Sequence, residues 1–211
     1  IIRGWDFQYK CPVCTVSQVQ PIDNDVGPTH RMNVLREFAA HRKALHEFAA
    51  KVKEDCSMLY GAGCEQEDYC DPAGMMQTDK SEGSSVAILR ELGFRPRMKM
   101  VSYKERLQLI RRLISTGLLV LHPDHCARLV EGFRGGYQYE TDRSGEPFKD
   151  EKPKKDGLYD HYQDALAYAI IHKFSLSMWR PRTVSPSYLY AIMQGGSARG
   201  KQINKFTGAW R

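Results

Sequence analysis

Short apolar runs and alternating residues predict β-structure in the N-terminal part of the chain. Two apolar runs at residues 1–7 and 13–19 flank a short polar stretch, which is typical of a β-hairpin. Residues 31–38 alternate imperfectly between apolar and polar side chains, which predicts a third strand. The strands predicted along the whole chain cover residues 1–7, 13–19, 31–38, 61–71, 94–101 and 118–121.

Apolar residues spaced three and four apart predict helices in the rest of the chain. Leu107, Ile110 and Leu113 would lie on one side of a helix, and Gly117 is a typical helix end. The predicted helices cover residues 41–59, 84–92, 104–115, 125–133 and 161–178. Three successive strands followed by alternating helices and strands predict an α/β protein whose mixed sheet has an antiparallel side and flanking helices. This is the element order of a ribonuclease H-like fold.

The distribution of charge and of turn-forming residues divides the chain into two regions. Residues 1–178 contain all the predicted elements and are long enough for one well-buried domain. Residues 179–211 contain no Asp or Glu, and we predict a basic, partly flexible C-terminal tail. Because the chain opens on an apolar run rather than on Met, we expect it to be one domain of a longer protein.

The chain is basic, with a formal net charge of +6. A positive surface attracts polyanions, whereas a soluble basic protein with a solvated tail would have the same composition. No apolar run approaches the roughly 20 residues needed to span a bilayer, and no signal peptide is present, so we predict no membrane contact.

Six cysteines raise the question of a metal site or disulfides. Cys11 and Cys14 have the spacing of a zinc-binding pair, but no second pair of Cys or His follows at the usual distance. We therefore predict free thiols rather than structural zinc.

Three short segments, each built around an acidic residue, are the best candidates for chemistry. Asp6 follows an apolar strand, Asp71 ends a second short strand before a Pro-Ala-Gly turn, and Asp164 lies near the start of a predicted helix. Two strand carboxylates that face a helix carboxylate can hold a pair of hard divalent cations for phosphodiester hydrolysis. The sequence has no other candidate site of this quality.

Each acid also has a purely structural interpretation. Asp6 would face water if its strand lay at the sheet edge, and Asp71 would form the turn that follows it. Asp160 is placed to cap the helix, with Gln163 completing a capping box. The negative charge of Asp164 would then interact favourably with the positive, N-terminal end of the helix dipole. These alternatives stay open when each residue is considered alone.

Taken together, the three segments resemble the nuclease domain of the large terminase subunit of tailed phages and related viruses. Family members have a Gly-Trp-Asp-Phe strand, present here at residues 4–7, and a central Asp-Pro-Ala-Gly, present at residues 71–74. They end with a His-x-x-Asp-Ala-Leu-x-Tyr helix, present at residues 161–168. The resemblance covers residues 1–178, and one departure is Ala167, where relatives often have Arg.

The resemblance implies a ribonuclease H-like fold and a metal-dependent endonuclease that cuts concatemeric double-stranded DNA during genome packaging. Asp6, Asp71 and Asp164 would be catalytic metal ligands for two Mg²⁺ or Mn²⁺ ions. His161 would join them as a catalytic residue, and Asp160 as a further metal ligand. The implied partners are the terminase ATPase domain, the portal and the small terminase subunit, in the cytoplasm of an infected host cell and transiently at the procapsid portal. No GxxxxGK[ST] motif occurs, so no ATP site is expected in this chain.

Contacts to DNA should be mainly with phosphates and therefore sensitive to salt. Lys152, Lys154 and Lys155, just before the last predicted helix, are the candidates, and a solvated run of charge is the alternative. Two other functions remain open at this point. One is another ribonuclease H-like nuclease, such as a junction resolvase or a hybrid nuclease, and the other is a non-catalytic module that binds DNA or the portal.

Overall fold

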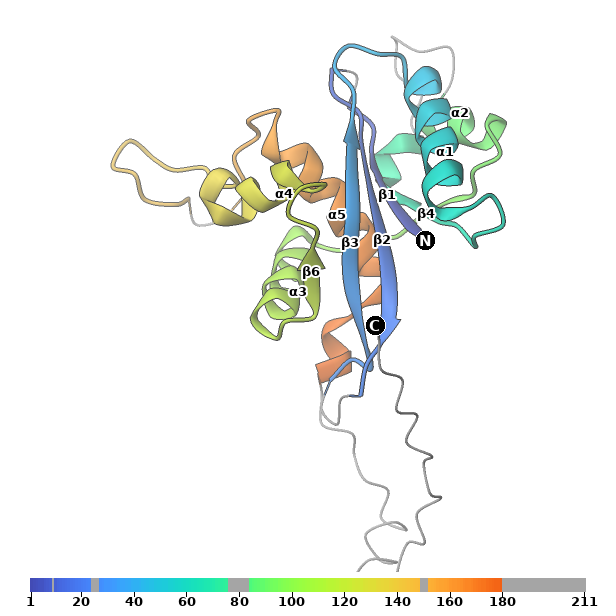
Figure 1. The fold of residues 1–211 in the computed structure, drawn as a ribbon. Coiled ribbons are helices and arrows are strands. Elements are labelled where there is room, and N and C mark those ends of the chain that lie inside the picture. Colours follow the sequence, from blue (N-terminus) through green and yellow to red (C-terminus); the bar gives the residue numbers. More distant parts are fainter. Residues whose placement is uncertain (9, 24–26, 76–83, 149–151, 180–211) are drawn as a thin grey trace, which may run out of the picture.

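The computed structural model contains a six-stranded mixed sheet (Figure 1). It describes residues 1–8, 10–23, 27–75, 84–148 and 152–179. The strands are β1 (Ile2–Asp6), β2 (Val13–Pro21), β3 (His30–Ala39), β4 (Glu67–Cys70), β5 (Pro96–Met98) and β6 (Leu119–Leu121). Their order across the sheet is β5-β4-β1-β2-β3-β6. Strands β1, β2 and β3 are antiparallel, whereas β4, β5 and β6 each run parallel to a neighbour, so the predicted mixed sheet is confirmed.

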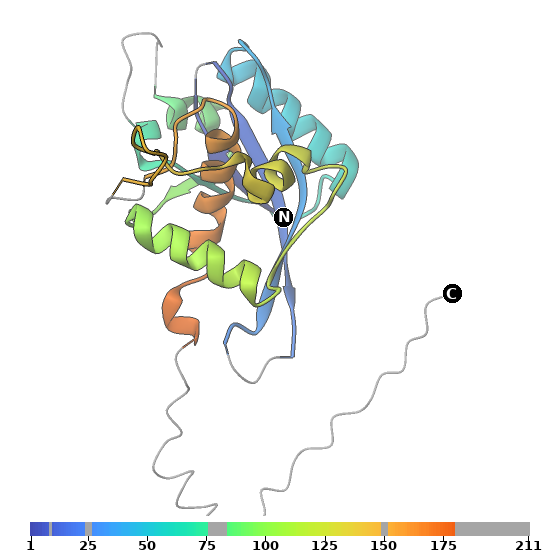
Figure 2. The same ribbon diagram turned by 90° about the vertical axis from the view of Figure 1, so that its left-hand side faces the viewer.

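Helices cover both faces of the sheet (Figures 1 and 2). The α-helices are α1 (Leu45–Tyr60), α2 (Ser85–Glu91), α3 (Tyr103–Ser115), α4 (Ala127–Glu131) and α5 (Tyr159–Lys173). Single turns of other helix types occur at Pro72–Met75, Gly132–Gly136 and Leu176–Trp179. One buried cluster joins the sheet to α3, α4 and α5, and a second joins its other face to α1 and α2.

Strand β1 connects the two clusters because successive side chains of a strand point to opposite faces. Ile2 belongs to the cluster around α5, and Trp5 belongs to the cluster on the other face, where its ring meets Phe48 and Phe94 edge to face. Asp6, next along the strand, therefore points toward α5, as the alternation of β1 predicts.

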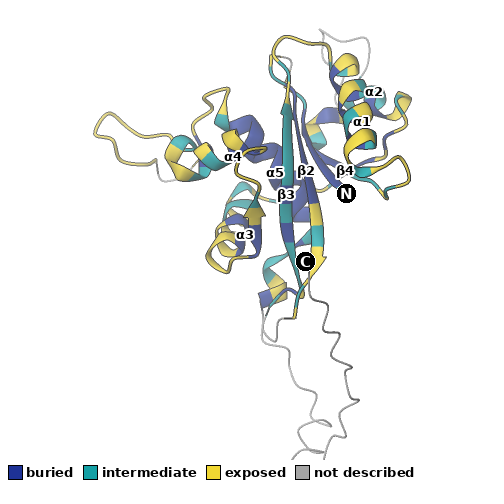
Figure 3. Ribbon diagram, in the orientation of Figure 1, coloured by how far each residue is buried: buried dark blue, intermediate teal, exposed yellow. Residues whose placement is uncertain are grey.

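Helix α5 is the central helix of the domain, and its residues from Asp160 to Ile171 are all buried (Figure 3). Its close approach to the sheet depends on Gly4 of β1. A Cβ atom at Gly4 would lie 2.0 Å from the backbone oxygen of Ala165, and neither backbone can yield easily. The glycine of the Gly-Trp-Asp-Phe motif is thus explained by packing.

We therefore expect Gly4→Ala to lower the free energy of unfolding by about 3 kcal/mol, the upper part of the range for overpacked cores. Chemical denaturation monitored by tryptophan fluorescence would measure it. Gly63→Ala is the matched control, since a Cβ there has no neighbour within 4 Å. Equal stability of the two variants would contradict the proposed packing role.

The start and end of α5 differ from the prediction. The helix begins at Tyr159, so Asp160 is a helical residue and its predicted capping role is wrong. The chain turns into the helix at Asp156 instead, whose Oδ1 accepts hydrogen bonds from the backbone N–H groups of Leu158 and Tyr159. Gln163 does not complete a capping box, because its Nε2 donates to the carbonyl of Leu129.

At the other end, α5 stops at Lys173 rather than continuing to residue 178, because Phe174 has an extended backbone and packs into the core. Trp179 is also buried in this core. The predicted basic tail from residue 180 onward lies outside the described residues. No helix in the described part of the chain is long and apolar enough to cross a membrane.

Candidate active site

The candidate site begins at the C-terminal end of β1, where Asp6 faces the first turns of α5. Asp6 is only 5% exposed. Nδ1 of His161 donates a hydrogen bond of 2.9 Å to its Oδ2. Asp6 is therefore buried and paired rather than a solvated edge acid.

Helix α5 contributes Asp160, His161 and Asp164. Residues four apart lie on the same side of a helix, so the two acids point the same way. Oδ2 of Asp160 lies 3.9 Å from Nδ1 of His161. Asp160 is only 1% exposed, so water does not reach it, and yet its Oδ1 has no hydrogen-bond partner. A buried carboxylate oxygen without a partner is costly and is a strong acceptor for a cation or a donor.

Two basic side chains meet the acids of α5. Nζ of Lys155 lies 2.7 Å from Oδ2 of Asp164 and 3.6 Å from Oδ2 of Asp160. Nη1 of Arg106, on α3, lies 3.6 Å from Oδ1 of Asp164. Lys155 was predicted only as a DNA contact, and its ammonium group instead lies against two of the predicted metal ligands. The contact with DNA stays a prediction.

Asp71 lies at the margin of this cluster. It is half-buried, and its Oδ1 accepts a hydrogen bond of 2.9 Å from the backbone N–H of Ala73, which matches its turn-forming interpretation. It lines a cavity of about 180 Å³ together with Lys99, Arg106 and Tyr168.

Tyr168 of α5 lines the same cavity as Asp71 and Arg106. Burial raises the pKa of Tyr168, and the charges of Asp164, Asp71 and Asp6 raise it further. Among the described residues, however, no group of three or more His, Cys, Asp and Glu side chains is close enough together to hold a metal ion. The structure thus gathers Asp6, Asp160, His161 and Asp164 at one site. Asp71 directly follows Cys70, the parallel register partner of Trp5, so it lies at the same end of the sheet as Asp6.

The electrostatics of the site reflect buried negative charge. Burial raises the pKa of Asp6, and this effect outweighs the hydrogen bond from His161. Burial would lower the pKa of His161, but the hydrogen bond and charge of Asp6 outweigh burial and raise it. Burial also raises the pKa of Asp160. Burial would lower the pKa of the Lys155 ammonium group, but the charge and hydrogen bond of Asp164 together with the charges of Asp160 and Asp6 outweigh burial and raise it.

One buried acid, Asp68, was missed by the sequence prediction. It is 2% exposed and lies on β4. Its carboxylate accepts hydrogen bonds from Nε and Nη2 of Arg3, at 2.7 and 3.0 Å, and from Nε1 of Trp5, at 2.9 Å. Because Asp68 faces Trp5 and the α1 side of the sheet, it is a structural acid apart from the candidate site.

The cysteines form no disulfide. All six are free, and Cys14 is buried, where burial raises the pKa of its thiol well above the usual value. The absence of disulfides among these residues agrees with the prediction of free thiols, and the absence of structural zinc stays a prediction.

Comparison with known proteins gives matches among solved structures. No protein-family model matches the sequence, and no curated protein matches it either. The nuclease domain of g2p, the large terminase of bacteriophage SPP1, solved with bound Mn, aligns with a TM-score of 0.54 and 18% identity over 82% of this chain and 85% of that one. The large terminase nuclease domain of P22 aligns with a TM-score of 0.55 and 17% identity over 86% of this chain and 85% of that one.

The large terminase of the thermophilic bacteriophage D6E is a longer match. Its TM-score is 0.58 at 14% identity, and the alignment covers 81% of this chain but 39% of that one. The present chain thus spans well under half of that protein. At these identities the likeness shows the fold alone. The ribonuclease H-like mixed sheet with flanking helices, as found in terminase nuclease domains, is confirmed.

Proposed function

We propose that this chain, which has the fold of the large terminase nuclease domains, is a divalent-metal-dependent endodeoxyribonuclease. Its substrate would be concatemeric double-stranded DNA, cut during viral genome packaging. The observation that carries the proposal is the buried group of Asp6, Asp160, His161 and Asp164 between the end of β1 and the start of α5. Buried carboxylates with raised pKa values are typical of functional sites rather than of structural ones.

The residues present fit a hard divalent cation. Carboxylate oxygens are the ligands that Mg²⁺ and Mn²⁺ prefer, and Oδ1 of Asp160 is a buried oxygen without a partner. We propose Asp6, Asp71 and Asp164 as the holders of two ions, with Asp160 as a further ligand. When bound, such ions lower the pKa of an attacking water and stabilise the leaving oxygen. Because Nζ of Lys155 lies 2.7 Å from Oδ2 of Asp164, we propose that Lys155 withdraws when a metal ion binds.

The chain's own residues have separate roles in this proposal. Asp6 holds the proton of His161 at Nδ1, which fixes the orientation of the imidazole ring and leaves Nε2 to accept or donate a proton. Arg106 balances part of the charge of Asp164. Lys152, Lys154 and Lys155 are proposed to meet DNA phosphates, in which case Lys155 exchanges Asp164 for a phosphate oxygen.

Partners and location follow from the same proposal. SPP1 g2p, the P22 protein and the D6E protein are large terminases, and the last is much longer than the present chain. We propose that the chain works with an ATPase domain, the portal and a small terminase subunit, in the cytoplasm of an infected cell and transiently at the procapsid.

The proposal is tested with supercoiled plasmid and the purified chain in Mn²⁺, Mg²⁺ or EDTA. Nicking and linearisation are expected with Mn²⁺ or Mg²⁺ and not with EDTA. Four-way junctions and RNA–DNA hybrids serve as competing substrates, since preferred cleavage of either would replace a terminase-like function by that of a resolvase or a hybrid nuclease. Folded protein that binds DNA and cuts none of these substrates would overturn the nuclease proposal for this chain.

Removal of Lys155 provides a test of metal binding that needs no DNA. Lys155→Met deletes the ammonium group 2.7 Å from Oδ2 of Asp164, so Mn²⁺ no longer competes with it. We expect about a tenfold gain in Mn²⁺ affinity, equivalent to about 1.4 kcal/mol, measured by isothermal titration calorimetry. Lys154→Met is the matched control and should leave the affinity unchanged. An equal affinity of wild type and Lys155→Met would show that Lys155 does not occupy the metal subsite.

A further inference from the structure

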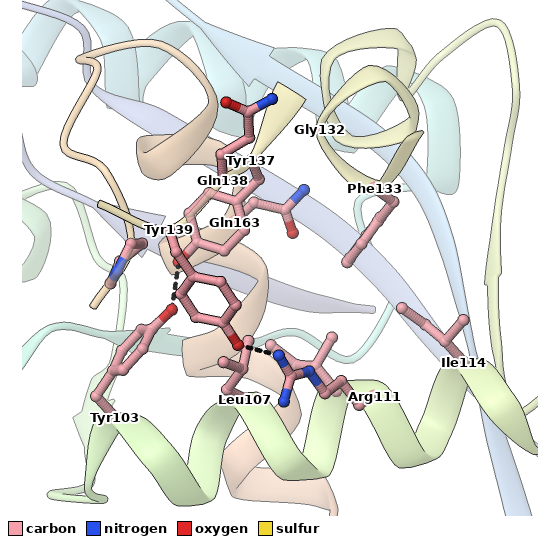
Figure 4. A pocket seen from close by; sticks show the side chains of 12 residues that line it. Tyr103, Leu107, Arg111, Ile114, Gly132, Phe133, Tyr137, Gln138, Tyr139 and Gln163 are labelled. Carbon is pink, nitrogen blue, oxygen red and sulfur yellow. Dashed lines mark hydrogen bonds between the residues drawn. The ribbon is translucent and has the colours of Figure 1, made fainter. Parts of the chain in front are cut away.

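A cavity of about 240 Å³ lies between α3, the turn Gly132–Gly136 and the segment that follows it (Figure 4). Apolar and aromatic side chains make most of its wall. The lining residues that matter below are Tyr103, Arg111, Ile114, Tyr137, Tyr139 and Gln163. None of them is among the residues assigned above to the candidate site.

The cavity adjoins the acid cluster. Gln163 precedes Asp164 on α5, and Tyr103 lies on α3, the helix whose Arg106 contacts Asp164. The hydroxyl of Tyr137 lies 3.2 Å from that of Tyr103, which is one helical turn before Arg106 on α3. A nucleotide whose phosphate lies at the acid cluster can therefore direct its base toward this cavity.

The walls of the cavity are held in place by hydrogen bonds. The hydroxyl groups of Tyr103 and Tyr137 lie 3.2 Å apart and share a hydrogen bond, and Arg111 donates one to the hydroxyl of Tyr139 (Figure 4). The guanidinium carbon of Arg111 also lies 5.6 Å from the centre of the Tyr139 ring, which places positive charge at the edge of the cavity. Preformed aromatic walls reduce the entropy lost when a planar ligand binds.

Among the described side chains that line this apolar space, Gln163 has a buried polar atom without a hydrogen-bond partner. The amide of Gln163 extends into the cavity, and its Oε1 has no hydrogen-bond partner although the residue is 2% exposed (Figure 4). Its Nε2 donates to the carbonyl of Leu129, which fixes the orientation of the amide. Gly132 makes room for it, because a Cβ there would lie 2.6 Å from Nε2. The cavity thus presents an unsatisfied acceptor that an amino group would complete.

We propose that this cavity receives one unstacked nucleobase of the DNA substrate, next to the phosphate at the acid cluster. Aromatic faces stack with any base, and the Gln163 acceptor suits the exocyclic amino group of adenine, cytosine or guanine. The volume suits one base and is too small for a base pair. Unstacking costs least where a base is already unpaired, so the cavity directs the site to DNA with a local distortion.

Binding in EDTA tests the proposal without cleavage. The probe is a labelled duplex with one unpaired adenine, compared by fluorescence anisotropy with the same duplex carrying an abasic residue at that position. Wild type is expected to bind the adenine duplex at least about fivefold more tightly, the lower end for base–aromatic stacking. Equal affinity would overturn the proposal.

A variant that fills the cavity tests whether the preference for the unpaired adenine arises there. Ile114 is 44% exposed at the cavity edge, so Ile114→Trp is expected to keep the fold, remove the preference for adenine and leave binding of the abasic duplex unchanged. Met58→Trp, at a position of α1 that is 68% exposed, is the matched control and should keep the preference. A preference that survives in Ile114→Trp would also overturn the proposal. The inference rests on the proposed nuclease function. Plasmid cleavage together with equal binding of the adenine and abasic duplexes would refute the role of the cavity and leave the nuclease function standing.

Discussion

Asp6→Asn is expected to abolish metal-dependent cleavage of DNA while it stabilises the fold. The substitution keeps the size of the side chain and removes its charge at the centre of the acid cluster. Loss of a metal ligand removes several kcal/mol of charge stabilisation, so the initial rate of plasmid nicking in Mn²⁺ should fall by about a thousandfold or more. A fluorescent or gel-based nicking assay measures this directly.

The gain in stability follows from the sign of the pKa shift. Burial raises the pKa of Asp6 in the folded state, so the ionised carboxylate is less favourable there than in the unfolded chain. The ionised Asp6 carboxylate therefore lowers the stability of the folded protein. This loss of stability begins as the pH rises above the pKa of the unfolded chain and is complete at neutral pH. Asp6→Asn removes it, and we expect a higher melting temperature than wild type at pH 7, with the difference shrinking toward acidic pH.

These two readouts separate a functional acid from a structural one. Neutralising a structural acid lowers the stability of the protein. Neutralising an active-site acid instead lowers its activity and raises its stability. Asp124→Asn, on an exposed loop, is the control and should change neither the nicking rate nor the melting temperature. Retention of the wild-type rate by Asp6→Asn would remove Asp6 from the catalytic residues.

The sequence correctly predicted the face to which a side chain points where a local pattern determines it. The alternation of β1 places Trp5 and Asp6 on opposite faces, and the structure confirms this. The spacing of four between Asp160 and Asp164 placed both acids on one side of a helix, and Lys155 contacts both. The start of the helix was wrong because the capping Asp156 lies in a charged segment where several acids match the same signal. Its end was also wrong, because Phe174 leaves the helical backbone to pack into the core.

What the sequence could not predict depends on contacts between distant segments. The role of Asp68 requires the parallel register that sets Arg3 beside it, and that register joins β1 to a strand more than sixty residues away. The contact of Lys155 with Asp164 depends on the path of a loop, which no periodicity describes. The unpaired oxygen of Gln163 likewise depends on the space that Gly132 leaves in another element.

Asp68→Ala is expected to produce the largest loss of stability among the acids of the sheet. It would leave Arg3, 2% exposed, with a buried charge and no counter-ion, and would also remove the acceptor of Nε1 of Trp5. Removing one partner of a buried ion pair costs about 3–5 kcal/mol, which is a large part of the stability of a typical domain. Chemical denaturation at pH 7 measures the change in the free energy of unfolding.

The environment of Asp68 explains why the loss should exceed that of any surface pair. Glu54→Ala breaks a pair with Lys51 in which both side chains are more than half exposed, and it should cost less than about 1 kcal/mol. The double variant Arg3→Leu with Asp68→Leu should recover much of the loss, since it leaves no unpaired charge. The folded fraction of Asp68→Ala should still cut DNA, because Asp68 faces away from α5. A loss of activity at full stability would instead place Asp68 in the active site.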